Sequence, residues 1–175
     1  MLFMTKVQVF KLLKPLLLFH VIIVISTFNC GTGLAPGSWH QYNSLQETDS
    51  SVKDRLTGEI QKFYGAPYVW GGDSPQGTDC SGMVKTIYQN AVQINLPHNA
   101  NEMSKLGVGV SKNRLIFGDL VFFSDMWNGR ATHMGIYIDR GYFLHASSSR
   151  GVILSKLNDN PYKRQFVGAK RIIDH

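Results

Sequence analysis

The spacing of apolar residues changes along this chain from a helical repeat to alternation, and this change constrains the fold more than any other feature. In two segments apolar residues recur every three or four positions, which predicts amphipathic helices. These positions are Val52, Leu56, Ile60 and Phe63 in the first helix and Met83, Val84, Ile87, Tyr88 and Ala91 in the second. Beyond residue 120 the period is two, which predicts strands over residues 120–123, 132–139, 142–146, 151–155 and 166–172.

The order of these elements predicts the fold class. Helices that are followed by strands indicate an α+β fold, in which N-terminal helices pack on an antiparallel sheet. A third, short helix is expected over residues 99–105. The chain has 175 residues, of which 43% are hydrophobic, and this is enough for one core but not for two ordinary domains.

The N-terminal 29 residues have the composition of a secretory signal peptide. Lys6, Lys11 and Lys14 precede an apolar run over residues 16–25, which is the usual order of a basic and then a hydrophobic region. The run is about 10 residues long, whereas a membrane-spanning helix needs about 20. The sequence therefore predicts an exported chain with a signal peptide over residues 1–29.

Charge gives little support for a nucleic-acid partner. Removal of three of the 18 Lys and Arg residues with the signal leaves 15 against 12 Asp and Glu, a net charge of +3. No cluster of basic residues interleaved with aromatic ones remains to follow a phosphate backbone. We therefore expect no nucleic-acid binding and only weak attraction to an anionic envelope surface.

The two cysteines are expected to have different fates. Cys30 follows the apolar run and precedes Gly31, the position at which a bacterial lipoprotein signal is cut and its new N-terminal cysteine is acylated. Residues 27–29 differ from the aliphatic and small residues usual there, so a plain signal cleavage nearby stays open. Both outcomes leave Cys80 without a disulfide partner.

The segment between the signal and the first helix is predicted to be a flexible tether. Residues 30–49 are rich in Gly, Ser, Asn and Gln and show no apolar period. Ser50 and its neighbours offer N-caps for the first helix, which we expect to end at Phe63 or Tyr64. The globular domain is then expected to occupy residues 50–175.

Cys80 is a candidate nucleophile because of its position and its neighbours. The apolar pattern places it in the first turn of the second helix, where unpaired backbone N–H groups favour a thiolate and lower the pKa of a thiol. It stands in Gly77-Thr78-Asp79-Cys80-Ser81-Gly82, in which the glycines let a substrate backbone approach and Asp79 can cap the helix. A lone cysteine is more often a small buried apolar side chain, and only this context favours the nucleophile.

A thiol nucleophile needs a base within hydrogen-bond reach, and the chain has six histidines. Four of them fall in the signal, in the tether, in a connecting turn where a solvated role is expected, and at the C-terminus: His20, His40, His98 and His175. His133 and His145 remain, on two strands that are predicted to form one hairpin. The alternative for this pair is two core histidines with satisfied N–H groups.

The turn of that hairpin decides whether the two imidazoles share a face. His133 and Gly135 lie on the same face of their strand. In a three-residue turn over residues 139–141 the glycine is left-handed. The residue numbers of any two residues that lie opposite each other on the paired strands then sum to 280, so that His145 faces Gly135. A two-residue turn over residues 140–141 would place the rings on opposite faces. We predict the three-residue turn and a shared face.

These residues together fit a catalytic triad. Cys80 attacks a carbonyl carbon, His133 takes and returns the proton, and His145 holds the tautomer of His133. The oxyanion is met by the Cys80 backbone N–H and a neighbouring donor. This chemistry requires no metal and no other cofactor.

Six short motifs extend the pattern over most of the chain. They are Tyr68-Val69-Trp70-Gly71-Gly72, Asp79-Cys80-Ser81-Gly82, Leu96-Pro97, Gly118-Asp119-Leu120-Val121-Phe122-Phe123, His133-Met134-Gly135-Ile136-Tyr137-Ile138 and Phe143-Leu144-His145-Ala146. In order and spacing they resemble the NlpC/P60 cysteine peptidases, from about residue 50 to residue 172, and within them the single-domain lipoprotein murein endopeptidases of the Spr type. The resemblance implies a papain-like fold and a Cys-His-His triad at Cys80, His133 and His145.

The resemblance also implies a substrate and a location. Family members cut peptide bonds in peptidoglycan stem peptides, either between D-glutamate and the diamino acid or at the D-alanine crosslink, and the Spr-type likeness favours the crosslink. In relatives that prefer a free stem N-terminus, residues matching Tyr68, Asp79 and Ser81 contact the substrate amine. Locally, the three are also explained as a packing aromatic, an N-cap and a helix-start hydroxyl. We expect a monomer in the cell envelope, held at the outer membrane by lipidated Cys30 and facing the periplasm.

Three further features are interpreted as structural or as part of the cleft. Trp70 and the pair Phe122-Phe123 are expected in the core instead of acting as carbohydrate platforms. Asp119 is expected to be a turn residue that opens a strand. Trp127, just before the His133 strand, is predicted to form one wall of the cleft.

Three other functions compete with a cysteine peptidase. One cysteine and two histidines could ligate zinc with a water as fourth ligand, which would make a zinc-dependent amidase. The fold could also carry a non-catalytic module that only binds the cell wall. A related cysteine acyltransferase or a toxin amidase delivered to another cell is the third, and the export signal argues against it.

Overall fold

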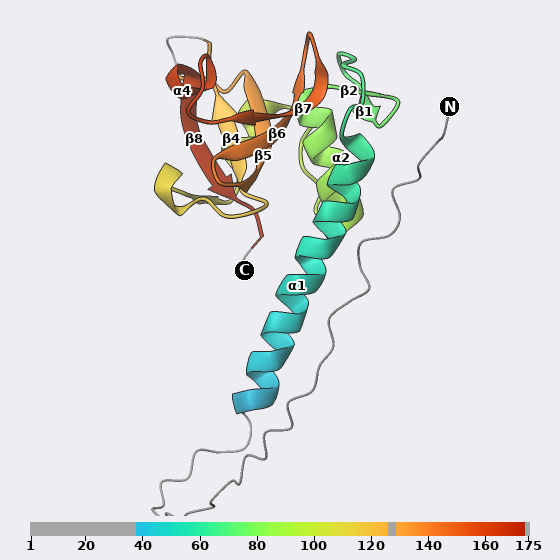
Figure 1. The fold of residues 1–175 in the computed structure, drawn as a ribbon, viewed down its shortest axis with the longest axis vertical. Coiled ribbons are helices and arrows are strands. Elements are labelled where there is room, and N and C mark those ends of the chain that lie inside the picture. Colours follow the sequence, from blue (N-terminus) through green and yellow to red (C-terminus); the bar gives the residue numbers. More distant parts are fainter. Residues whose placement is uncertain (1–37, 126–128, 174–175) are drawn as a thin grey trace, which may run out of the picture. The chain divides into compact units, whose positions relative to one another are not determined.

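The computed structural model describes the backbone of residues 38–125 and 129–173, and the side chains of these residues from Ser50 onward. The chain divides into two units, residues 1–35 and 36–175, and the described residues belong to the second. In that unit the two longer helices precede the strands of the main sheet, which confirms the predicted α+β class (Figure 1). No helix in the described ranges is long and apolar enough to cross a bilayer. The predicted signal peptide and Cys30 lie outside these ranges.

The first helix, α1 (Ser38–Phe63), begins well before its predicted start at Ser50. The prediction of a tether over residues 30–49 is therefore wrong for residues 38–49, which are helical. These residues contain neither Gly nor Pro, so nothing interrupts the backbone hydrogen bonds as the helix extends toward its N-terminus. The predicted apolar stripe is confirmed, because Leu56 and Phe63 are fully buried.

The second helix, α2 (Cys80–Val92), is confirmed with its cap and its buried face. Asp79 is its N-cap, and the five predicted apolar residues are all buried. It packs between α1 and the sheet (Figure 1). Arg55 of α1 donates from Nε to the carbonyl of Ala91 at 2.7 Å, which satisfies a carbonyl in the last turn of α2. A short α3 (Ala100–Met103), capped by Asn99, follows within the predicted range.

The main sheet has six antiparallel strands in the order β3-β8-β4-β5-β6-β7. These strands are β3 (Val108–Gly109), β4 (Leu120–Phe123), β5 (His133–Asp139), β6 (Tyr142–Ser147), β7 (Gly151–Lys156) and β8 (Phe166–Arg171). The five predicted strands are confirmed, with ends that agree to within one residue. The smaller elements are β1 (Asp73–Ser74), β2 (Gly77–Thr78), the 3-10 turn η1 (Lys112–Arg114) and α4 (Tyr162–Gln165). The insertion of β8 between β3 and β4 was not predicted.

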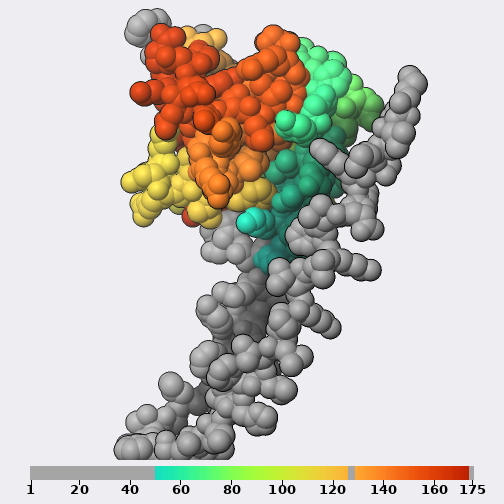
Figure 2. All heavy atoms as spheres, viewed as in Figure 1, coloured from blue at the N-terminus to red at the C-terminus, as the bar shows by residue number. Residues whose placement is uncertain are grey.

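Both faces of the central strand β4 are buried. Leu120 and Phe122 belong to the core cluster that includes the helices, whereas Val121 and Phe123 belong to a second cluster on the other face. In the space-filling view the teal and green atoms of residues from about 50 to 80 lie directly against the orange atoms of the strands (Figure 2). Burial on both faces explains why this strand is a continuous apolar run, and it confirms the core positions of Phe122 and Phe123.

The turn before β4 is joined to the rest of the domain by buried polar contacts. Asp119 accepts the backbone N–H of Ile116 at 2.9 Å, which confirms its predicted role in a turn. It is 1% exposed, and both of its carboxylate oxygens accept hydrogen bonds at 2.8 Å from the guanidinium of Arg171 on β8. The hydroxyl of Tyr88 on α2 donates to the carbonyl of Gly118. These contacts hold β4 against both β8 and α2.

We predict that Arg171→Met destabilises the domain. The change leaves the Asp119 carboxylate buried without its bidentate partner, the Arg171 guanidinium. This loss costs about 3–5 kcal/mol of unfolding free energy. Urea unfolding followed by fluorescence measures it. Lys105→Met is the matched control, because it breaks an exposed pair with Glu102 and should leave the unfolding midpoint nearly unchanged. Equal midpoints for the two variants would contradict the prediction.

Candidate active site

One pocket of about 530 Å³ brings together segments that are far apart in the sequence. It is lined by the turn before β1, the start of α2, the region of α3 and the residues that lead into β5: Tyr68, Trp70, Gly71, Asp79, Cys80, Ser81, His98, Asn99, Ala100, Asn101, Arg130, Ala131, Thr132 and His133. Cys80 and His133 therefore share a pocket. His145 lies outside this lining, at 1% exposure.

Cys80 is a free, partly buried thiol at the first position of α2. Burial, together with the Asp79 carboxylate, raises the pKa of Cys80 to about 11, although the backbone N–H groups of Met134, Ser81 and Cys80 itself act in the opposite direction. The expectation of a lowered pKa at the helix start is therefore wrong for the resting site. Loss of hydration on burial thus outweighs the effect of the helix start.

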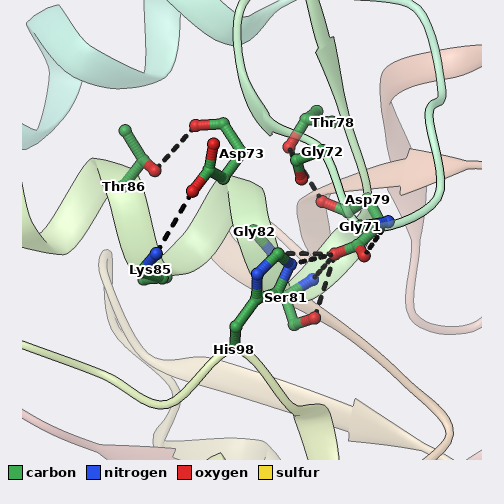
Figure 3. A network of polar contacts seen from close by, with 10 residues as sticks. All are labelled: Gly71, Gly72, Asp73, Thr78, Asp79, Ser81, Gly82, Lys85, Thr86 and His98. Carbon is green, nitrogen blue, oxygen red and sulfur yellow. Dashed lines mark hydrogen bonds and ion pairs between the residues drawn. The ribbon is translucent and has the colours of Figure 1, made fainter.

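Asp79 holds the helix start and the preceding turn together (Figure 3). One oxygen, Oδ1, accepts the backbone N–H groups of Ser81 at 2.9 Å and of Gly82 at 2.8 Å. The other, Oδ2, accepts the N–H of Gly71 at 2.9 Å. Burial alone would raise the pKa of Asp79, but these hydrogen bonds and one from His98 lower it. The carboxylate is thus a negative charge fixed beside Cys80.

His98 lies in the pocket, where sequence reasoning expected only a solvated turn residue. Its side chain is 29% exposed, and its Nε2 lies 3.1 Å from Oδ1 of Asp79 (Figure 3). A Cβ at Gly82 would come within 2.8 Å of His98 Nε2 and within 2.0 Å of the Gly72 carbonyl oxygen. The absence of a side chain at Gly82 therefore lets the His98 ring and the Gly72 carbonyl lie close to the start of α2. No spacing in the sequence connects His98 with Asp79, so this partner was missed.

The turn between β5 and β6 differs from the predicted one. Arg140 and Gly141 both have positive φ, 49° and 83°, and Asp139 pairs with Tyr142. This is a two-residue turn, so the prediction of a three-residue turn over residues 139–141 is wrong. Two left-handed residues match the twist of the flanking strands, which favours this type of hairpin connection.

A β-bulge restores the predicted register of the same hairpin. The pairing shifts between Tyr137 and Asp139, so that Tyr137 lies opposite Phe143 and the pair numbers sum to 280. A Cβ at Gly135 would lie 3.1 Å from the Cβ of His145, as expected if the two residues oppose each other. His133 and His145 therefore project from one face of the sheet, which confirms the shared face that the sequence predicted.

The two imidazoles are in direct contact. His133 Nε2 lies 2.9 Å from His145 Nδ1, with the rings at 87° to each other. The ring of His145 stacks on Phe143 at 25°, with a centroid distance of 4.9 Å. Its Nε2 lies 2.9 Å from the Ser155 hydroxyl and 3.2 Å from the Tyr162 hydroxyl. Packing and hydrogen bonds thus fix His145 behind His133.

Both imidazoles are neutral at pH 7. Burial lowers the pKa of His133 to about 4, against a smaller opposing effect of Asp125. Burial, followed by the charges of His133 and Arg150, lowers the pKa of His145 to about 3. A neutral imidazole is the form that can accept a proton, so His133 is ready to act as a base.

The contacts of His145 allow only one useful arrangement of protons. If His145 donates its Nε2–H to Ser155 or Tyr162, its Nδ1 has a lone pair and accepts Nε2–H from His133. The remaining nitrogen of His133, Nδ1, then carries a lone pair and can take a proton. The opposite arrangement places a proton on that nitrogen and removes the base. The partners of His145 thus decide whether His133 can accept a proton.

Ser155 and Tyr162 were not identified from the sequence. Ser155 could have been found, because it lies on the same face of β7 as Ile153, which pairs with His145. Tyr162 comes from the separate helix α4 and has no signal in the sequence.

The proposed substrate residues lie in the pocket. Tyr68 is in its lining, and burial, with the charges of Cys80 and Asp79, raises the pKa of its hydroxyl. Ser81 is also in the lining, and its hydroxyl donates to Asp79 Oδ1 at 2.9 Å. Trp127, predicted as a cleft wall, lies outside the described residues.

Trp70 is 86% exposed, so its predicted place in the core is wrong. It stands in a tight turn, in which the N–H of Gly72 donates to the carbonyl of Val69 at 3.0 Å. Its neighbour Val69 covers Gly77, where a Cβ would come within 2.5 Å of a Val69 methyl group.

Metal ligation was the alternative for the cysteine and the two histidines. Within residues 38–125 and 129–173, no group of three or more His, Cys, Asp or Glu side chains is arranged so that it could hold a metal ion. The donor set that was considered for zinc does not fit, because His145 directs its nitrogens to His133, Ser155 and Tyr162.

Comparison with known proteins gives a family and several relatives. The model of the NlpC/P60 family matches residues 65–171. Murein DD-endopeptidase MepS/Murein LD-carboxypeptidase of Escherichia coli (strain K12) is 37% identical over 122 residues, which cover 70% of this chain and 64% of that protein. Gamma-DL-glutamyl hydrolase of Bacillus subtilis (strain 168) is 38% identical over 114 residues, which cover 65% of this chain and 28% of that protein.

A solved structure is similar over the same region. The crystal structure of an NlpC/P60 family protein from Bacillus cereus ATCC 10987 matches with a TM-score of 0.65 and 36% identity, covering 70% of this chain and 40% of that one. This match confirms the predicted papain-like fold. In each case the matched region is less than two thirds of the relative's length.

We predict that the domain loses stability as the pH falls from 6.5 toward about 4. In this window histidines of the unfolded chain bind protons that buried His133 and His145 do not, so the unfolding free energy decreases. With two such groups the slope approaches about 2.7 kcal/mol per pH unit. Urea unfolding at several pH values measures it, and His145→Gln should remove about half of the slope. A slope that is unchanged in this variant would contradict the assignment.

We also predict that Ser155→Ala combined with Tyr162→Phe mixes the tautomers of both imidazoles. The double change removes both oxygen partners of His145 Nε2, so nothing fixes the proton there. Imidazole ¹⁵N chemical shifts at pH 7 should show one tautomer of His133 in the wild type and two in the variant. Ser149→Ala, at an exposed serine, is the matched control. A single unchanged tautomer in the double variant would show that these hydroxyls do not set it.

Proposed function

The chain belongs to the NlpC/P60 family, and we propose that it is a cysteine peptidase that hydrolyses peptide bonds in peptidoglycan. The observation that carries this proposal is that Cys80, at the start of α2, lines one pocket with His133, whose Nε2 is held by His145. The name of the relative from Escherichia coli, a murein endopeptidase, supports this substrate and reaction, and the name of the relative from Bacillus subtilis supports hydrolysis of a γ-glutamyl bond.

The proposed reaction begins from a neutral thiol and a neutral imidazole. Because the pKa of Cys80 lies above that of His133, the resting site holds no separated charge. His133 takes the thiol proton at Nδ1 as the sulfur attacks the scissile carbonyl carbon. His145, itself held by Ser155 and Tyr162, accepts the hydrogen bond from Nε2 of His133 and stabilises the positive charge that develops there.

The remaining steps use the same groups. The Cys80 backbone N–H and a neighbouring donor stabilise the negative oxygen of the tetrahedral intermediate. His133 then returns its proton to the leaving amine, and an acyl-enzyme thioester remains. A water molecule gives a proton to His133 and attacks the thioester, which releases the carboxylic acid and restores the thiol.

We favour the bond between D-alanine and the diamino acid of a crosslink. The relative from Escherichia coli, which is named a murein DD-endopeptidase, supports this choice. The bond between γ-D-glutamate and the diamino acid is the second candidate. It is supported by Tyr68, Asp79 and Ser81 beside Cys80, because the lowered pKa of Asp79 keeps a negative charge where a free stem amine could bind.

The proposed location follows from the substrate and the N-terminal sequence. Residues 1–29 act as a signal peptide, and Cys30 carries a lipid that holds the enzyme at the outer membrane, facing the periplasm. The intact mass of protein isolated from bacterial membranes tests this, because acylation of Cys30 adds the mass of the lipid. A mature N-terminus without that mass would contradict the anchor.

We predict that the purified protein releases new peptides from isolated peptidoglycan and that Cys80→Ala releases none above background. Mass spectrometry of the products identifies the bond, since cleavage at a crosslink converts dimeric stem peptides into monomers. Ser149→Ala is the matched control and should give wild-type products. If Cys80→Ala and the wild type release the same products, the proposed peptidase is wrong.

The same digestion separates the competing functions. A zinc amidase would lose activity with a chelator and recover it with zinc, whereas the proposed enzyme keeps its activity. A non-catalytic wall-binding module would bind the polymer and release nothing. Either result would replace the cysteine peptidase proposal.

A further inference from the structure

Trp70 is the most exposed large apolar side chain among the described residues, at 86%, and it belongs to the lining of the catalytic pocket. An exposed indole at the lip of a pocket presents a large apolar face to any molecule that enters it. Neither the fold nor the proposed reaction uses this side chain, so its position requires another explanation.

The turn that presents Trp70 is rigid. The N–H of Gly72 donates to the carbonyl of Val69 at 3.0 Å, and Gly71 has a φ of +73°, the pattern of a type II turn with Trp70 at its second position. The N–H of Val69 donates to the Thr78 carbonyl at 3.0 Å. The turn therefore holds the Trp70 backbone in one place, which lowers the entropy lost when a ligand binds.

The same turn is fixed relative to the nucleophile. The N–H of Gly71 donates to Asp79 Oδ2 at 2.9 Å, and the N–H of Asp79 donates to the Gly72 carbonyl at 3.0 Å (Figure 3). Asp79 directly precedes Cys80. A ligand that contacts the indole is thus held at a defined distance from the sulfur.

The chemistry of the pocket indicates which part of the substrate meets the indole. The rest of the lining includes the polar side chains Asp79, His98, Asn101 and Arg130, which suit a peptide that carries charges. Stem peptides consist of alanine, glutamate and a diamino acid and contain no ring. The flat face of a pyranose is made of C–H groups, which are attracted to the negative face of an aromatic ring.

We propose that Trp70 forms a saccharide subsite that stacks on a pyranose of the glycan strand to which the stem peptide is attached. This subsite rests on the proposed peptidoglycan substrate and extends it. The enzyme would then distinguish peptides that still carry sugar from free peptides.

The test compares binding of two ligands with the same peptide, one bearing its disaccharide and one without it. Calorimetry in a Cys80→Ala background measures affinity without turnover. We expect the disaccharide to improve affinity about tenfold, and Trp70→Ala to remove that advantage without changing the affinity for the free peptide. Trp70→Phe should retain part of it. Tyr64→Ala, which removes an aromatic side chain that is 60% exposed and is not in the pocket lining, is the matched control.

The outcomes separate this subsite from the proposed function. If Trp70→Ala weakens both ligands equally, the indole contacts the peptide and the saccharide subsite is wrong. If the disaccharide gives no advantage while the wild type hydrolyses peptidoglycan, the subsite is wrong and the proposed function stands. If the advantage depends on Trp70 but the wild type releases no peptides from isolated peptidoglycan, the proposed function is wrong and the subsite stands. Binding of neither ligand overturns both.

Discussion

The carboxylate of Asp79 joins the parts of this site that must not move relative to one another. Its Oδ1 caps α2 through Ser81 and Gly82, and its Oδ2 holds the turn at Gly71. Because Cys80 is the next residue, these bonds fix the sulfur relative to the wall of the pocket. Burial is the main cause of the raised pKa of Cys80, and the negative charge of Asp79 adds to it, so the group that positions the thiol also opposes its ionisation.

Activation of the thiol must then come from the other side of the pocket. His133 is neutral, and the chain from Tyr162 and Ser155 through His145 allows its Nδ1 to carry a lone pair. Because the thiol and the imidazole are both neutral at rest, neither needs a counter-charge, and in the proposed reaction the proton moves only when a carbonyl carbon is available for attack. Burial, which raises one pKa and lowers the other, is the common cause of this neutral state.

The hairpin of β5 and β6 shows how a correct prediction can rest on an incorrect detail. Alternation along each strand fixes which residues share a face, and the buried side of the sheet fixes the register. The turn over residues 140–141 is shorter than predicted, but the bulge after Tyr137 compensates for the missing residue. The bulge therefore lets the hairpin keep a favoured two-residue turn and still bury the apolar residues of β5 and β6.

From the sequence alone we could predict α2, α3, the buried stripe of α1, five of the six strands of the main sheet and the shared face of His133 and His145. Each of these depends on spacing within one segment, where the helical repeat and the alternation of a strand act directly. Only the tertiary structure decided that Trp70 is exposed, that His98 meets Asp79 and that Tyr162 meets His145. These contacts join segments that are distant in the chain, and no local pattern records which of them will meet. The pKa of Cys80 also depends on such packing, because burial of the sulfur raises it while the backbone N–H of Met134, more than fifty residues away in the sequence, acts in the opposite direction.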